Sequence, residues 1–196
     1  MPITINGSGT IGGISVGGLP DGIVDNDTLA SGTPNTAALP AGSILQVVST
    51  TKTDTFSTTS GSLVDVSGFN VSITPSSSSS KILVTGGLCW GSSDTTPYLV
   101  RFVLLRNSTQ ICIADAAGSR SRGTLGSQGV YDTDHTLWAP INFLDSPSTT
   151  SSTTYKMQVV AESGRTVWVN RGAESDGDLP ITARFTSTIT VMEVAA

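Results

Sequence analysis

Residues 154–161 read Thr-Tyr-Lys-Met-Gln-Val-Val-Ala, and this stretch decides the fold class. Its odd-numbered residues from 155 onward are apolar, whereas Lys156 and Gln158 are polar. Successive side chains of a β-strand point to opposite faces, so this alternation places the apolar residues on one face. The stretch therefore indicates a half-buried β-strand whose core-facing residues are Tyr155, Met157, Val159 and Ala161.

Comparable alternating or β-branched stretches recur along the chain, and no segment of useful length has the 3.6-residue period of a helix. Loops rich in serine, threonine, glycine and proline separate them. We therefore predict an all-β fold, a β-sandwich or jelly roll with about nine or ten strands. The expected strands cover residues 44–50, 63–74, 81–90, 98–106, 110–115, 131–144, 154–161, 165–171 and 186–194.

One of these stretches, residues 63–74, changes the parity of its apolar residues halfway along. Val64 and Val66 are even-numbered, whereas the apolar residues from Phe69 onward are odd-numbered. Gly68 lies at the change. A β-bulge inserts an extra residue with a relaxed backbone, which suits a glycine, so we predict a bulge here.

The first 42 residues differ from the rest in composition. They contain nine glycines, four prolines and three aspartates but no lysine or arginine. An isolated segment of this kind does not offset its ordering entropy, about 1–2 kcal/mol per residue for the backbone. Its spaced apolar residues favour shelter against other subunits over a plain linker. We predict an extended attachment arm at 1–42 and a β-domain at 43–196, with particle or inter-subunit contacts at Ile3, Ile5, Ile11, Ile14, Val16, Leu19, Ile23, Val24 and Leu29.

The last expected strand carries apolar residues on both faces. Ile189 and Val191 share one parity, and Met192 and Val194 share the other. A strand buried on both faces of an antiparallel sandwich needs a second cover. Another subunit and a crossing loop of the same chain are equally good covers, and in the first case these four residues form a trimer interface.

The formal net charge of −5 and a pI near 4.6 exclude several partner classes. A sequence-independent nucleic-acid-binding protein needs a basic stripe, and an anionic membrane attracts basic segments. No apolar run approaches the roughly 20 residues that span a bilayer, and no secretory signal is recognisable. We expect neither nucleic acid nor membrane as a partner.

Cys89 and Cys112 lie in apolar, strand-like surroundings without a Cys-x-x-Cys spacing. Free cysteine is among the residue types most often buried, so we predict two unpaired thiols and no structural zinc. A reducing site of synthesis inside a host cell agrees with this prediction.

Candidate catalytic groups are sparse. The single histidine, His135, follows Asp132 and Asp134, but on a strand it points away from both carboxylates. The acidic run at 174–178 lacks the spacing of a calcium loop, and its Asp-Gly pair is typical of a turn. We therefore expect a protein that is not an enzyme and that has no metal or cofactor.

Two further features admit a binding role. Arg120 and Arg122 form the one local basic cluster; a solvated loop is the default interpretation, and pairing with acidic groups of a neighbouring subunit or receiving a saccharide are the alternatives. The tryptophans have apolar neighbours and are expected in the core, although exposed indole rings would stack on a host glycan. These tryptophans are Trp90, Trp138 and Trp168.

Several segments resemble those of tailed-bacteriophage fibre and virion structural proteins, particularly of cyanobacterial and marine phages. The arm segment 7–30, Gly-Ser-Gly-Thr-Ile-Gly-Gly through Asp-Asn-Asp-Thr-Leu-Ala, is similar to arms on such proteins. The later segments Ser-Ile-Thr-Pro-(Ser)5-Lys-Ile-Leu-Val (72–84), Phe-Leu-Asp-Ser-Pro-Ser-Thr-Thr (143–150) and Ser-Thr-Ile-Thr-Val-Met-Glu-Val (187–194) resemble a β-domain found in the same proteins.

This resemblance implies a jelly roll of the tumour-necrosis-factor-like kind, a homotrimer, and an arm that docks to other virion proteins of the capsid, tail or baseplate. The expected function is that of a short tail fibre, tail appendage or head fibre. The alternatives are a capsid decoration protein that stabilises the head and an adhesin module that binds a host glycan. The expected location is the virion, assembled in the host cytoplasm and released by lysis.

Overall fold

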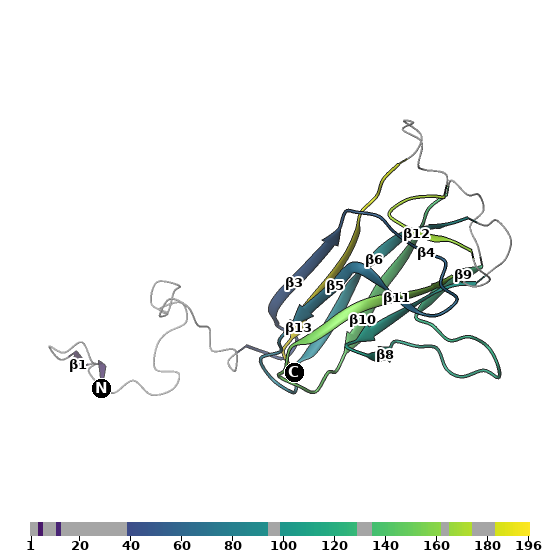
Figure 1. Cartoon of the computed structure of the whole chain (residues 1–196). Coiled ribbons are helices and arrows are strands. Elements are labelled where there is room, and N and C mark those ends of the chain that lie inside the picture. Colours follow the sequence, from purple (N-terminus) through teal and green to yellow (C-terminus); the bar gives the residue numbers. More distant parts are fainter. Residues whose placement is uncertain are drawn as a thin grey trace. The chain divides into compact units, whose positions relative to one another are not determined.

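The computed structural model of the chain contains two compact units, Met1–Leu39 and Pro40–Ala196, which are described separately (Figure 1). In the first unit, β1 (Thr4–Ile5) pairs antiparallel with β2 (Ile11–Gly12). The second unit is the body of the protein. The structure describes residues 4–5, 11–12, 39–93, 99–128, 135–161, 165–173 and 183–196.

The body is all-β, as predicted: its described residues form eleven strands and no helix. Two short strands, β4 and β9, were not predicted, because three or four residues are too few to show an alternation. The strands are β3 (Ile44–Lys52), β4 (Phe56–Thr58), β5 (Val64–Ile73), β6 (Lys81–Ser92), β7 (Leu99–Arg106), β8 (Thr109–Ile111), β9 (Leu125–Gln128), β10 (Leu137–Asp145), β11 (Thr153–Ala161), β12 (Val167–Val169) and β13 (Ser187–Val194).

The strands form two antiparallel sheets that pack face to face (Figure 1), one of six strands and one of five. In the first sheet the order is β3–β13–β6–β10, and β4 and β12 continue the lines of β3 and β13. In the second the order is β5–β11–β7, with β8 and β9 sharing the outer edge of β7. If β3/β4, β8/β9 and β12/β13 each count as one interrupted strand, the body has eight strands. Numbered along the chain, they are ordered 1-8-3-6 in the first sheet and 2-7-4-5 in the second, which is the topology of a jelly roll.

The core lies between the two sheets and consists of the inward-facing side chains of both. The alternation that predicted β11 is confirmed, since its four core-facing residues have no exposed surface. Trp90 of β6 packs on Phe102 of β7 with their ring centroids 5.4 Å apart and the planes tilted by 60°. This contact across the sandwich is a favourable geometry for an aromatic pair.

β5 has a bulge at the predicted place, but it inserts three extra residues rather than the predicted one. Opposite β11 the pairing jumps from Asp65 with Gln158 to Asn70 with Lys156, so four residues of β5 face a single residue of its partner. Gly68 has a φ of 76°, a left-handed conformation that a glycine adopts without strain. The bulge shifts the core-facing side from even to odd positions.

Asn170 joins the interrupted strands of the first sheet. It lies at the end of β12, is fully buried and has a φ of 64°. Its Nδ2 donates to the carbonyl oxygens of Lys52 at 2.9 Å and Asp54 at 2.8 Å. Its Oδ1 accepts a hydrogen bond of 2.6 Å from the hydroxyl of Ser187, where β13 begins. One side chain thus ties the break between β3 and β4 to the break between β12 and β13.

A buried carboxylate links the two sheets near the end of β10. Asp145 accepts hydrogen bonds from Nη1 of Arg106 at 2.9 and 3.0 Å and from the hydroxyl of Tyr155 at 2.7 Å. Burial, followed by the bond to Asp145, raises the pKa of Tyr155, so its hydroxyl stays protonated and donates this bond.

Candidate functional site

The clearest candidate surface is a row of apolar side chains that crosses the outside of the first sheet. The strand register pairs Val47 of β3 with Met192 of β13, Met192 with Leu83 of β6, and Leu83 with Leu144 of β10. Val47 is 56% exposed and Leu144 is 48% exposed, while Met192 and Leu83 between them are half-buried. We call these four residues the apolar row.

The rest of this surface is almost free of charge. We call the outward-facing side chains of β3, β13, β6 and β10 the outer face. At the end where β3 begins, Ile44 and Val194 extend the apolar row, and Ile44 is 47% exposed. On the other side of the row lie short polar side chains, Ser49, Thr190, Thr85 and Asn142. Among the described residues of the outer face, Lys81 is the one charged side chain.

The outside of the second sheet is different. There Lys156 of β11 forms an ion pair of 2.7 Å with Asp65 of β5, and Gln158 donates to the same carboxylate at 2.8 Å. Arg101 of β7 lies on the same side. The two outer surfaces of the sandwich therefore differ in charge, and only the first presents a broad uncharged face.

The structure separates the four residues predicted as a trimer interface. Ile189 and Val191 have no exposed surface and belong to the core of the single chain, so they offer nothing to a partner. Met192 and Val194 point outward and lie on the outer face. No described segment of the chain covers the exposed ends of the apolar row.

A buried carboxylate fixes the strands beneath the apolar row. Glu193 follows Met192, points inward and has no exposed surface. Its Oε1 accepts hydrogen bonds of 2.7 Å from the backbone N–H and from the hydroxyl of Ser76, and its Oε2 accepts one of 2.5 Å from Nε2 of Gln46. Nε2 of Gln46 also donates to the carbonyl of Thr74 at 2.7 Å.

These bonds decide the charge of Glu193. Burial by itself would raise its pKa, but the hydrogen bonds from Ser76, Gln46 and Ser80 outweigh burial and hold the pKa below the ordinary value of 4.5. Glu193 is therefore ionised at neutral pH. It fixes the serine-rich turn after β5 to the ends of β3 and β13.

The three tryptophans lie in different surroundings. Trp90 is 2% exposed in the core and cannot stack on a glycan. Trp168 is half-buried, and the guanidinium of Arg171 lies 5.5 Å from its ring centroid. Trp138 is 52% exposed, and its indole lies against Gly87, where an added Cβ would come within 2.5 Å of the ring. Only Trp138 offers an open aromatic surface, against the expectation of core packing.

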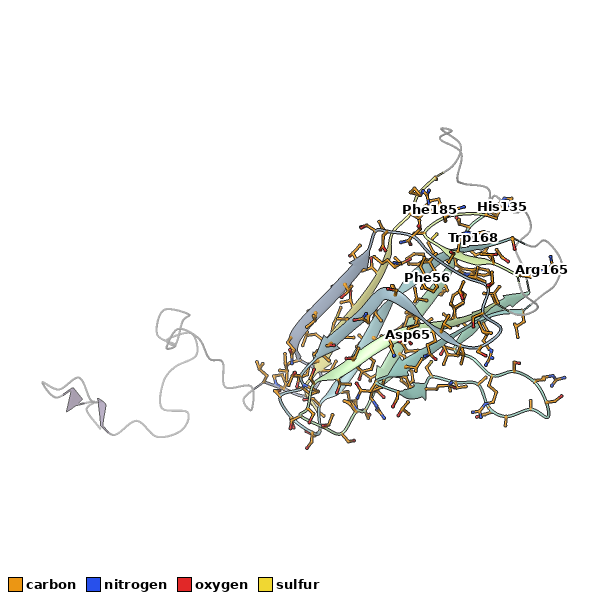
Figure 2. The ribbon with its side chains drawn as sticks, viewed as in Figure 1. Phe56, Asp65, His135, Arg165, Trp168 and Phe185 are labelled. Carbon is orange, nitrogen blue, oxygen red and sulfur yellow. The ribbon has the colours of Figure 1, made fainter. Side chains whose placement is uncertain are left out.

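The candidate catalytic groups are not brought together in the part of the chain that the structure describes. Asp132, Asp134 and the run at 174–178 lie outside the described residues. His135 is exposed, and Figure 2 shows it toward the same end of the body as Trp168 and Phe185. Among the described residues there is no group of three His, Cys, Asp or Glu side chains able to hold a metal ion, and no helix long and apolar enough to cross a membrane.

The two cysteines are unpaired, Cys89 buried and Cys112 half-buried. Burial raises the pKa of both thiols, which keeps them protonated at neutral pH. Of the arm residues predicted to make contacts, Ile5 and Ile11 lie in β1 and β2. The other seven lie outside the described residues.

Sequence reasoning missed three residues of the apolar row, namely Val47, Leu83 and Leu144. Each belongs to a stretch predicted as a strand, and the parity of Leu83 and Leu144 differs from that of the core residues around them. That parity is the one signal in the sequence for an outward apolar side chain. It does not show which strands are neighbours, and the row exists only because four distant strands are adjacent.

Comparison with known proteins finds likeness among solved structures alone. No protein-family model matches the chain, and no curated protein matches its sequence. The structure of the Gt strain of infectious bursal disease virus is similar at 18% identity and a TM-score of 0.42, over 77% of this chain and 38% of that one. The VP2 subviral particle of the same virus is similar at 15% identity and a TM-score of 0.38, over 77% and 38% of the two chains.

The T=1 particles derived from the same virus are similar at 17% identity and a TM-score of 0.39, over 77% of this chain and 36% of that one. The chain thus spans less than two fifths of the length of these proteins. Likeness at this level does not establish a shared function.

Proposed function

We propose that this protein is a non-catalytic structural component of a virus particle, and that copies of it associate through the outer face. The observation that carries the proposal is the uncharged face with the exposed apolar row across it, on a jelly-roll body. Jelly rolls are common among viral capsid domains. The sequence resemblance to virion structural proteins supports the same role.

Charge selects this face for contact between copies. A chain of net charge −5 repels its own copies wherever charged surfaces meet. On the outer face Lys81 is the one charged side chain among the described residues, so two copies meet there with little repulsion. Association would also remove the exposed ends of the apolar row from water, which is worth about 25 cal/mol per Å² of apolar surface.

The size of the face agrees with this role. Four strands about 4.8 Å apart, each with about eight residues of about 3.3 Å, make a face of about 500 Å². A typical stable interface buries about 800 Å² on each partner. The outer face therefore supplies most of an interface of ordinary size, and side chains at its rim and in the flanking turns supply the remainder.

At a finer level we propose a homotrimer on a tailed-bacteriophage particle, as a short tail fibre, tail appendage or head fibre. In this arrangement the arm at residues 1–42 docks to other virion proteins and the body projects outward. A capsid decoration protein is the alternative that the resemblance also allows. Assembly takes place in the host cytoplasm, and lysis releases the particle.

Light scattering of the full chain tests the association. We expect a trimer at micromolar concentration, and we expect the double variant Val47→Glu, Leu144→Glu to be a folded monomer, because both positions are exposed in a single copy. The matched control Thr109→Glu, Gln110→Glu places the same two charges at exposed positions of β8, in the second sheet, and should leave the trimer intact. A monomeric wild-type chain, or a trimeric double variant, would contradict association through this face.

The virion role is tested on particles. Mass spectrometry of purified virus particles whose genome encodes the chain should detect it in a fixed copy number. Electron microscopy with antibodies against the body should then label one location, and that location distinguishes a tail appendage from a head fibre or a decoration protein. Absence of the chain from the purified particles would refute the proposal.

A further inference from the structure

A second candidate site lies at the edge of the sandwich formed by β9. Two hollows flank this strand, and Leu125 and Gly126 line both of them. One hollow, of about 230 Å³, is basic, and the other, of about 250 Å³, is aromatic. β9 lies between them: Arg101 is on the outside of the second sheet, and Trp138 is on the outside of the first, across the edge of the sandwich.

The basic hollow is built around Arg101 of β7. Its Nη1 donates a hydrogen bond of 2.6 Å to the carbonyl of Arg122. Its Nε is buried and has no hydrogen-bond partner. A buried N–H of a guanidinium is costly to leave unsatisfied, so the geometry leaves a donor for an acceptor that the described residues do not supply.

The loop that closes this hollow adds positive charge. Nε of Arg122 donates to the carbonyl of Ala114 at 2.6 Å, which ties the two ends of the loop together. Neither Arg101, Arg120 nor Arg122 forms an ion pair with a carboxylate among the described residues, whereas Lys52, Arg106 and Lys156 each do. Asp115 is the acidic residue of this loop. Arg101 lines the basic hollow, and Arg120 and Arg122 are exposed on its loop, so the positive charge at this place favours an anionic ligand.

The aromatic hollow lies on the other side of β9. Leu137, Trp138 and Pro140 of β10 line it, together with core residues of β6 and β7. Trp138 is half exposed although it belongs to a regular strand and packs on Gly87. An exposed, fixed indole is a platform for the C–H face of a sugar ring.

We propose that this edge binds an acidic oligosaccharide that runs round it from one sheet to the other, with the carboxylate of a uronic acid residue at Arg101 and a ring further along the chain against Trp138. A carboxylate is planar and accepts two parallel hydrogen bonds from one guanidinium, which would include the unsatisfied Nε. Ser121, which also lines the basic hollow, offers a hydroxyl to the sugar. Arg101 lies away from the outer face, whereas Trp138 lies at its β10 edge, so the contribution of Trp138 rests on that edge staying uncovered when copies associate.

An acidic peptide also carries carboxylates, but the second hollow favours a saccharide. A peptide would satisfy Arg101 and leave the aromatic platform without a role. An oligosaccharide that runs round β9 uses both hollows, because it carries acidic groups and apolar ring faces along its length. The combination of arginine, hydroxyl and indole is thus better matched by a sugar acid than by a run of aspartates.

Titration calorimetry of the full chain with a hexamer of galacturonic acid tests the proposal. We expect binding that weakens with added salt, since a charge pair is screened. The fully methyl-esterified hexamer has the same sugar rings without the charge and should bind at least ten-fold more weakly. Poly-glutamate has the charge without the rings and should also bind at least ten-fold more weakly than the hexamer.

Three variants locate the site. Arg101→Gln and Trp138→Ala should each weaken binding at least ten-fold, and Arg101→Lys should lie between wild type and Arg101→Gln because it keeps the charge but not the paired donors. Lys156→Gln removes one positive charge from the second sheet outside both hollows and should bind as wild type. Melting curves of each variant check the fold.

Absence of binding to the galacturonate hexamer at millimolar concentration would overturn the proposal, as would equal binding of poly-glutamate. Equal loss in Lys156→Gln would show attraction by net charge alone and would also overturn it. Light scattering of the same samples reports the oligomeric state separately, so a failure here is distinguishable from a failure of association through the outer face.

Discussion

Substitution of Glu193 by glutamine tests whether the buried carboxylate holds the end of the first sheet together. The wild-type side chain accepts two hydrogen bonds from Ser76 and one from Gln46. In the variant, one oxygen becomes an NH₂ group. If that group faces Gln46, two donors meet; if it faces Ser76, a backbone N–H loses its acceptor.

The expected loss of stability follows from these three hydrogen bonds. An unsatisfied buried donor costs about 1–3 kcal/mol, and hydrogen bonds to a charged group are worth about 1 kcal/mol more than those to a neutral one. Rotation of the Gln46 amide does not rescue the variant, because Nε2 of Gln46 also donates to Thr74. We expect the free energy of unfolding to fall by about 3 kcal/mol at pH 7.

The lowered pKa of Glu193 also predicts how the difference in the free energy of unfolding between wild type and variant changes with pH. The pKa of Glu193 is lower in the folded state than its ordinary value of 4.5. A lowered folded pKa contributes stability that is present above the unfolded pKa and is lost as the pH falls through the folded pKa. The difference between wild type and variant should therefore shrink between pH 5 and pH 3, because the variant has no charge to lose.

Urea unfolding followed by tryptophan fluorescence, at one protein concentration, measures this difference. Other carboxylates are common to both proteins and cancel. Asp65→Asn is the matched control: this carboxylate also has a lowered pKa, chiefly through Lys156, but it is largely exposed and should cost less than about 1 kcal/mol. A loss below 1 kcal/mol at pH 7, or an undiminished loss at pH 3, would refute the assigned role.

Three further outcomes are expected. Asn170→Asp places a carboxylate against two carbonyl oxygens and should lower the free energy of unfolding by about 3 kcal/mol in urea; a loss under 1 kcal/mol would contradict the junction described for it. Gly86→Ala brings a Cβ within 2.0 Å of a backbone oxygen of β13, so it should lower the melting temperature strongly or prevent folding, whereas Gly61→Ala, with open space around it, should be neutral. An aromatic disulfide reagent should modify Cys112 faster than Cys89 in the folded chain and both equally in urea; faster reaction of Cys89 would contradict its burial.

Much of the core could be predicted from the sequence because a strand has a simple two-residue period. Parity alone identifies the core-facing residues of β11, and a change of parity identifies the bulge at Gly68. Both are properties of one stretch of chain. They do not depend on which strands become neighbours, so the order of residues within that stretch is enough to identify them.

The candidate surfaces could not be predicted in the same way, because each combines distant stretches. Val47 and Met192 lie side by side only through the register of β3 and β13. Trp90 and Trp138 both have apolar neighbours in sequence, yet one is in the core and the other is half exposed. Arg101 becomes notable only when β9 and the loop that precedes it close a hollow around it.

The two proposed surfaces lie mainly on different sheets of the sandwich, so one chain can carry both. Association through the outer face covers the first sheet, whereas Arg101 lies on the outside of the second. Trp138 is on β10, at the edge of the outer face, and is the one residue of the saccharide site that a second copy would approach. The monomeric variant Val47→Glu, Leu144→Glu should therefore keep the contribution of Arg101 to galacturonate binding. If the monomeric variant differs from wild type only in how strongly Trp138→Ala weakens galacturonate binding, then the edge that carries Trp138 belongs to the interface between copies.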